Sequence, residues 1–126
     1  MSEVPGREQR HVPKPWGSEQ IWALTDRYCG KVIRIDSGKR LSLQRHERKE
    51  ESLMVLRGLL RLHLEDDTGT VRVHELGPGE SAHVNVNRIH RFEAATDVEL
   101  VEVSTPEIDD VERLEDDFGR EGTSAP

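Results

Sequence analysis

The chain has 126 residues, of which 34% are charged and 33% hydrophobic, and its formal net charge is −7. This length suits one domain with a core of its own, and the negative charge argues against nucleic acid as a partner because phosphate contacts need clusters of Lys and Arg. No apolar run is long enough to span a membrane, no signal peptide is recognisable at the N-terminus, and the single Cys29 fits a reducing compartment, so we expect a cytoplasmic protein.

In chain order, the sequence predicts a polar segment, a domain built of strands, and a polar tail. We expect residues 1–12 and 119–126 to be poorly ordered, which leaves 13–118 for the domain. Within it, apolar and polar residues alternate in short segments separated by turns that contain Gly or Pro. Regular spacing of this kind indicates an all-β barrel or sandwich. The expected strands cover 31–36, 40–46, 52–58, 59–65, 70–76, 81–86, 90–95 and 98–104.

The end of the domain, residues 108–119, carries a helical pattern. Val111, Leu114 and Phe118 recur at helical spacing, and Gly119 could end a helix. We expect one or two turns of helix, or an extended arm, that packs Leu114 and Phe118 on the barrel.

Four potential metal ligands lie in two short segments of the chain. Gln44 and His46 are two residues apart, so their side chains face the same way on a strand. Glu51, or Glu50 in its place, follows shortly, and His90 completes the set. Imidazoles with a carboxylate suit a divalent ion such as Zn, Mn, Co, Ni or Fe. The alternative is a polar cluster that is held together by hydrogen bonds alone.

The spacing of these residues resembles the first motif of the cupin barrel. The chain matches G-x5-H-x-H-x3–4-E-x6-G from Gly38 to Gly58, with Gln44 in place of the first His. The six residues that separate Glu51 from the final Gly favour Glu51 over Glu50 as the ligand.

The second cupin motif is matched less closely. Asn85 and Asn87 stand at the positions of its Pro and Gly, and Ala94 stands at the position of its terminal Asn. His90 stands at the position of the motif's His, but the turn that precedes it has an altered sequence.

Further strings narrow the resemblance to one branch of the cupins. KPWGSEQIWA at 14–23, RLSLQRHERKEE at 40–51 and HRFEA at 90–94 are similar to the type II mannose-6-phosphate isomerase-like cupins. The resemblance covers Lys14 to Arg120 and implies a single-domain jelly-roll barrel, or double-stranded β-helix. It also implies an aldose–ketose isomerase for sugar phosphates that works through a metal-stabilised enediolate. The implied metal ligands are Gln44, His46, Glu51 and His90.

The sequence does not identify the base that moves the proton. Three cations, Arg40, Lys49 and Lys31, are catalytic candidates that could hold a phosphate or the enediolate charge, although each could also be a surface charge. Arg40 shares strand parity with the expected ligands, so it should point inward and bind substrate together with Lys49. His83 lies on the strand leading to the site, and Trp16 could cover one end of the barrel. Both are further candidates for substrate binding.

Small cupins host several kinds of function, so two alternatives stay open. One is another metal-dependent enzyme, such as a dioxygenase or a biosynthetic tailoring enzyme, and the other is a non-catalytic cupin that binds a sugar or an effector. The expected partners are a small-molecule sugar or sugar phosphate and a second copy of the chain in a homodimer. No nucleic acid or membrane partner is expected.

Overall fold

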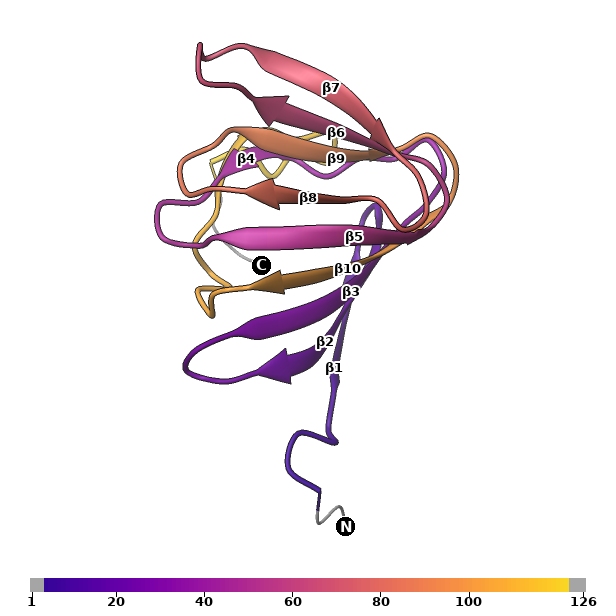
Figure 1. Ribbon diagram of the computed structural model, residues 1–126, viewed down its shortest axis with the longest axis vertical. Helices are drawn as coiled ribbons and strands as arrows, with labels where there is room; N and C mark the ends of the chain where they lie inside the picture. The colour runs from indigo at the N-terminus through magenta and orange to yellow at the C-terminus, as the bar shows by residue number, and fades with distance from the viewer. Residues whose placement is uncertain (1–3, 123–126) are drawn as a thin grey trace.

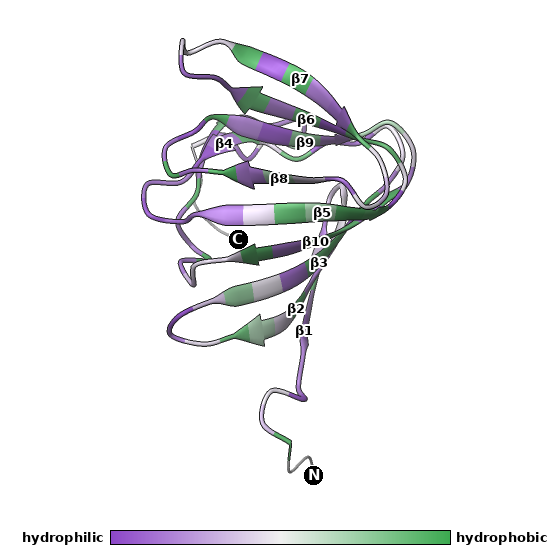
Figure 2. Ribbon diagram, in the orientation of Figure 1, coloured by the Kyte–Doolittle hydropathy of each residue, from purple (hydrophilic) through white to green (hydrophobic). Residues whose placement is uncertain are grey.

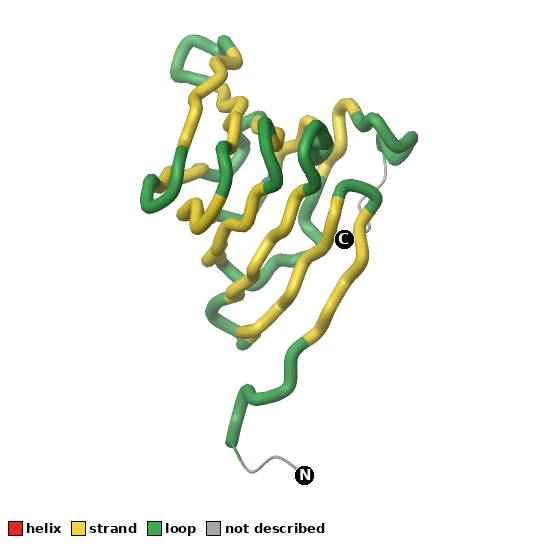
Figure 3. The backbone as a smooth tube through the Cα atoms, turned by 90° about the vertical axis from the view of Figure 1, so that its right-hand side faces the viewer, coloured by secondary structure: helices red, strands yellow, loops and turns green. Residues whose placement is uncertain are grey.

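The computed structural model describes residues 4–122, and all the regular structure in that range is β-strand (Figures 1 and 3). The expected all-β fold is therefore confirmed, and within these residues no helix is long and apolar enough to cross a bilayer. The strands are β1 Arg10–Lys14, β2 Gly17–Leu24, β3 Cys29–Ile35, β4 Leu43–Arg45, β5 Glu51–Arg57, β6 Leu60–Glu65, β7 Val71–Leu76, β8 Ser81–Val84, β9 His90–Ala94, β10 Val98–Ser104 and β11 Glu112–Glu115.

Two antiparallel sheets form the walls of the barrel. The larger sheet has the order β1-β2-β3-β10-β5-β8, and the smaller has the order β11-β4-β9-β6-β7. Strands far apart in the sequence are neighbours in both sheets, and this arrangement is the jelly roll. The N-terminal strand β1 begins at Arg10, inside the segment 1–12 that we expected to be poorly ordered. Residues 1–3 and 123–126, which belong to that segment and to the tail 119–126, lie outside the described residues.

Alternation along the strands determines which side chains enter the space between the sheets. On β3, β5 and β10 every second side chain is buried, and Figure 2 shows hydrophobic and hydrophilic residues interleaved along the strands. Burial of apolar surface between the sheets is the main term that stabilises such a fold. The core cluster consists of Trp16, Ile33, Ile35, Leu41, Leu53, Val55, Leu60, Leu62, Val84, Phe92, Ala94, Val98 and Leu100.

The buried side chains change character along the barrel. On β10, Val98 and Leu100 are apolar, whereas Glu102, two residues further on the same face, is charged. The antiparallel registers place Glu102 opposite Lys31 of β3, and Ser104 opposite Glu51 of β5. One end of the interior is thus apolar and the other is charged. We call them the apolar end (Ile33, Ile35, Val55, Leu60, Leu62, Val98 and Leu100) and the charged end (Glu19, Lys31, His46, Lys49, Glu51, His90 and Glu102).

Gly58 ends the first motif where β5 turns towards β6. Its φ is +86°, a conformation that side-chain-bearing residues rarely adopt. A Cβ atom there would lie 2.0 Å from the carbonyl oxygen of Asp97. The turn therefore requires glycine for two independent reasons.

Of the two forms expected for residues 108–119, one or two turns of helix or an extended arm, the structure shows the arm and no helix. Its strand β11 pairs antiparallel with β4, with Arg113 opposite Gln44. We call residues 106–122 the C-terminal arm. Leu114 is half-buried, but Phe118 is 37% exposed, so the expected packing of Phe118 on the barrel was wrong. A helix this short is marginal on its own, and the ladder with β4 outweighs the helical spacing.

Candidate metal centre

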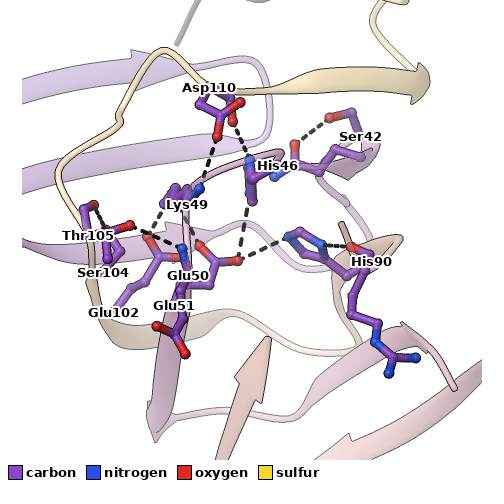
Figure 4. A network of polar contacts seen from close by, with 12 residues as sticks. Ser42, His46, Lys49, Glu50, Glu51, His90, Glu102, Ser104, Thr105 and Asp110 are labelled. Atoms are coloured by element: carbon purple, nitrogen blue, oxygen red, sulfur yellow. Dashed lines mark hydrogen bonds and ion pairs between the residues drawn. The ribbon is translucent and has the colours of Figure 1, made fainter. Parts of the chain in front are cut away.

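Three buried side chains point their donor atoms at one another inside the charged end (Figure 4). Nε2 of His90 lies 3.0 Å from Oε1 of Glu51, and Nε2 of His46 lies 3.9 Å from the same oxygen. All three donor atoms fall within 4.8 Å of one another. Metal–ligand bonds of about 2.0–2.2 Å let two donors of one ion lie up to about 4.4 Å apart. The cluster is therefore gathered at nearly the spacing that a bound ion requires.

The other ring nitrogen of each histidine is held by a backbone carbonyl. Nδ1 of His46 lies 2.5 Å from the carbonyl oxygen of Asp110, and Nδ1 of His90 lies 2.9 Å from that of Arg88. A carbonyl can only accept, so Nδ1 carries the proton in each neutral ring and Nε2 keeps its lone pair. This is the arrangement by which proteins orient metal-binding imidazoles.

The chemistry of the donor set also fits a cation. Nε2 of His46, Nε2 of His90 and Oε1 of Glu51 are buried without a hydrogen-bond partner, while Oε2 of Glu51 forms an ion pair with Nζ of Lys49. Burial lowers the pKa of His46 to about 4, against the raising effect of the Glu51 carboxylate, so the ring is neutral near pH 7. Lone pairs that face each other in a buried site repel unless a cation lies between them. The cluster can therefore hold a metal ion.

The choice between the two neighbouring glutamates follows from the pleat of β5. Glu51 is the first residue of β5, and its side chain is only 1% exposed inside the barrel. Glu50 points away from the cluster (Figure 4). Its Oε2 lies 3.0 Å from Nε2 of the exposed His83. Glu51 is therefore the glutamate that faces His46 and His90.

Gln44, the remaining expected ligand, lies beside the cluster. Its Cα is paired with that of His90 across β4 and β9. Its Oε1 accepts a hydrogen bond of 2.7 Å from the hydroxyl of Ser42. Its coordination of a metal remains a prediction.

The turn before His90 uses asparagine where the cupin motif has glycine. Asn87 has φ 61°, in the left-handed region that Asn tolerates better than other side-chain-bearing residues. Its backbone N–H donates to the carbonyl oxygen of His46 at 2.7 Å. The altered turn thus keeps the required backbone shape and ties the two ligand-bearing segments together.

Lys49 joins the metal cluster to a second buried carboxylate. Its Nζ lies 3.1 Å from Glu51 and 3.5 Å from Glu102. Burial opposes the charge of Lys49, but the carboxylates of Glu102 and Glu51 raise its pKa above the usual value. Burial and the neighbouring Glu51 raise the pKa of Glu102, whereas the charge of Lys49 outweighs burial and lowers the pKa of Glu51. Lys49 is thus a buried cation that holds Glu51 in its charged form.

A narrow cavity of about 50 Å³ lies beside the cluster, between the barrel and the C-terminal arm. Lys31 enters it, with its Nζ 3.3 Å from Glu19, and Lys14 lies 3.7 Å from the same carboxylate. Burial opposes the charge of Glu19, but Lys31 and Lys14 outweigh it and lower the pKa of this carboxyl. The lining residues are Lys14, Trp16, Glu19, Lys31, Leu41, Ser42, Gln44, His46, Lys49, Ile108, Val111, Arg113 and Arg120.

The other expected substrate contacts divide into two groups. Trp16, Lys31 and Lys49 line the cavity, so they lie where a substrate would meet the cluster. Arg40 does not line the cavity but forms a two-pronged ion pair with Asp117 of the C-terminal arm. His83 is 47% exposed on β8, where it contacts Ser52, Asn85 and Glu50.

Three acidic residues of the site were not expected from the sequence. Glu102 shares strand parity with Val98 and Leu100, and the same rule applied to β2 would have pointed Glu19 inward. The alternation of side chains along a strand could therefore have indicated that Glu102 and Glu19 are buried. Asp110 contacts the site from the C-terminal arm, and no local pattern marks it.

Comparison with known proteins gives one family. The family model for the mannose-6-phosphate isomerase C-terminal domain matches residues 4–116. The alginate biosynthesis protein AlgA of Pseudomonas aeruginosa is 32% identical over 114 residues, which are 86% of this chain and 23% of that protein. The mannose-1-phosphate guanylyltransferase of Escherichia coli is 32% identical over 119 residues, 90% of this chain and 24% of that protein. The chain spans about a quarter of the length of these relatives.

Solved structures share the fold at low sequence identity. KdgF from Halomonas sp. superposes with a TM-score of 0.68 at 20% identity, covering 80% of this chain and 89% of that one. Oxalate decarboxylase from Bacillus subtilis superposes with a TM-score of 0.76 at 14% identity, covering 85% of this chain and 30% of that one. The barrel described above is thus the cupin fold.

Proposed function

The chain belongs to the family of mannose-6-phosphate isomerase C-terminal domains, a branch of the cupins, and on that basis we propose that it is a metal-dependent isomerase of sugar phosphates. It would interconvert an aldose phosphate and a ketose phosphate. The observation that carries the proposal is the cluster of His46, Glu51 and His90, whose unpartnered donor atoms converge beside a cation-lined cavity.

A divalent ion held by His46, Glu51 and His90, with Gln44 as a further ligand, would supply Lewis-acid polarisation of the substrate carbonyl. The chain's own residues provide the remaining functions. Lys49 keeps Glu51 ionised, while Lys31 and Lys14 line the cavity with positive charge. These cations favour a substrate that carries negative charge.

Isomerisation requires a group that carries a proton between C2 and C1. The proton leaves C2 for a base, the C2 hydroxyl proton passes to the oxygen on C1, and the base returns its proton to C1. Of the residues that line the cavity, Glu19 is the one carboxylate. It is ionised near pH 7 because Lys31 and Lys14 lower its pKa. We assign it as the base.

The test is the interconversion of mannose 6-phosphate and fructose 6-phosphate by protein loaded with Zn²⁺, Co²⁺ or Mn²⁺, with elemental analysis of each sample. His46→Ala should lose both the metal and the turnover. Glu19→Gln should keep the metal and lose turnover by about 10²-fold or more. Lys39→Gln, a change at an exposed lysine outside the cavity, is the matched control and should do neither.

Three outcomes would overturn the proposal. Metal-loaded protein that converts no aldose phosphate would exclude the isomerase. Oxygen consumption by the Fe²⁺-loaded protein would instead indicate a dioxygenase. Thermal stabilisation by a sugar phosphate without turnover would indicate a binding module.

A further inference from the structure

Asp110 of the C-terminal arm contacts the loop that carries His46 through both its backbone and its side chain. Its carbonyl oxygen accepts the Nδ1 proton of His46 at 2.5 Å. Its carboxylate accepts the backbone N–H groups of Glu47, Arg48 and Lys49 at 3.2, 2.6 and 2.9 Å. Figure 4 shows the bonds from Asp110 to His46 and Lys49. One residue, more than 60 positions away in the sequence, thus satisfies four donors next to the metal cluster.

The carboxylate determines the shape of the loop between His46 and Glu51. Three successive N–H groups that converge on one anion form a compact turn, and the anion fixes their mutual orientation. The shape of this loop also sets the direction in which the Lys49 side chain enters the barrel and contacts Glu51.

The carbonyl of Asp110 determines which nitrogen of His46 faces the cluster. Because it can only accept, the neutral ring must carry its proton on Nδ1 and leave Nε2 free to bind an ion. The carboxylate of the same residue anchors that carbonyl against the loop, so the side chain and the backbone act together.

The rest of the arm is held without Asp110. Strand β11 pairs with β4, and Glu112 forms an ion pair with Arg45, with its Oε2 2.8 Å from Nε. Asp117 of the arm forms a two-pronged ion pair with Arg40 of the barrel. Removing the Asp110 carboxylate therefore leaves the arm attached and changes chiefly the loop that it contacts.

We infer that Asp110 is a positioning residue of the metal centre, which fixes the tautomer and the aim of His46 and holds the turn that leads to Glu51. The inference rests on the proposed metal site. A purely structural role, in which Asp110 only stabilises the turn, is the alternative that the test must separate.

The experiment measures two quantities on Asp110→Ala, Asp110→Asn and the control Asp109→Ala, whose native side chain is exposed. One is the affinity for Zn²⁺, by competition with a chelator. The other is the tautomer of His46 in metal-free protein, from the ¹⁵N chemical shifts of its ring. Asp110→Ala should bind Zn²⁺ about 10- to 100-fold more weakly and show a mixture of His46 tautomers. Asp110→Asn keeps an acceptor oxygen and should fall between Asp110→Ala and the unmodified chain, which Asp109→Ala should match.

The inference is wrong if Asp110→Ala melts at a lower temperature while its Zn²⁺ affinity and its His46 tautomer stay at the values of the unmodified chain. If Asp110→Ala does not fold, Asp110→Asn decides the question by the same two measurements. If the unmodified chain binds no Zn²⁺, the proposed function fails on its own. In that case the His46 tautomer of the metal-free variants still supports or overturns the role of Asp110.

Discussion

The apolar end and the charged end of the barrel are built from the same strands. On β10, Leu100 and Glu102 are adjacent on the buried face, and on β3 the same is true of Ile33 and Lys31. Alternation therefore determines which side chains are buried, while the residue type at each buried position determines what that part of the interior does. One end holds the sheets together, and the other gathers ligands and charges.

Their energetics differ accordingly. Each apolar side chain stabilises the fold by leaving water, at about 25 cal/mol per Å² of apolar surface. Each buried charge must instead be matched, because the desolvation of an ion can exceed the attraction to its partner. Lys49 is matched by Glu51 and Glu102, and Lys31 by Glu19. The charged end therefore contributes little net stability, and perturbed ionisable groups of this kind are typical of functional sites.

Among the variants considered, loss of the Lys49 charge should lower the stability of the charged end the most. Lys49→Met leaves the carboxylate of Glu51 buried without its cation, so the unfolding free energy of the metal-free protein should fall by about 3–5 kcal/mol. Urea unfolding at neutral pH measures it. Lys39→Met, at an exposed lysine, is the control and should change the value by at most about 0.5 kcal/mol. A Lys49→Met variant as stable as the control would show that charge matching does not govern this end.

The apolar end should respond through packing alone. Leu100 is 0% exposed, so Leu100→Ala should lower the unfolding free energy by about 2–5 kcal/mol through lost burial and a cavity. Its Zn²⁺ affinity should stay within about threefold of the unmodified chain, since Leu100 is not one of the residues that converge on the metal cluster. Isothermal titration with Zn²⁺ and urea unfolding on the same sample check both statements. A large loss of affinity in Leu100→Ala would mean that the two ends are coupled.

Metal binding should stabilise the protein through the charged end. At Zn²⁺ concentrations about 100 times the dissociation constant, the unfolding free energy should rise by about 2.7 kcal/mol. His90→Ala removes one of the three converging donors and should abolish most of this gain. His74→Ala, at an exposed histidine of β7, serves as the control and should keep it. Equal stabilisation of both variants would place the bound ion elsewhere.

The smallest expected effect lies in the turn that leads to His90. A β-branched residue resists the left-handed φ of Asn87, so Asn87→Val should destabilise the protein by about 1–2 kcal/mol. Asn87→Gly takes that φ without strain and should be neutral within a few tenths of a kcal/mol. Thermal melting of the two variants side by side tests this. If both variants melted together, the φ of Asn87 would not be what constrains the turn.

Alternation and turn residues were enough to predict the β class, and the expected strands 52–58, 59–65 and 98–104 overlap β5, β6 and β10. The convergence of His46, Glu51 and His90 was predictable from the sequence. The residues stand at the ligand positions of two recognisable motifs, and side chains two residues apart on a strand face the same way. These signals are local, so they survive without knowledge of the whole fold.

The remaining features depend on contacts between distant segments. β11 is stabilised by the edge of β4, so the helical spacing of Val111, Leu114 and Phe118 was misleading. The prediction that the Arg40 side chain points inward failed because Asp117, 77 residues away, forms an ion pair with its guanidinium group. Lys49 and Lys31 look like surface charges in a sequence, since the carboxylates that allow their burial lie on other strands.

The bond from Asp110 to His46 has a consequence for how the protein is made. A ribosome delivers a chain from its N-terminal side, and folding begins while synthesis continues. His46, Glu51 and His90 are thus present for some time before Asp110 and β11 emerge. During that interval His46 lacks its acceptor and β4 has an open edge. A nascent chain that still lacks residues 110–115 should therefore bind the ion more weakly than the finished chain, because His46 is not yet oriented.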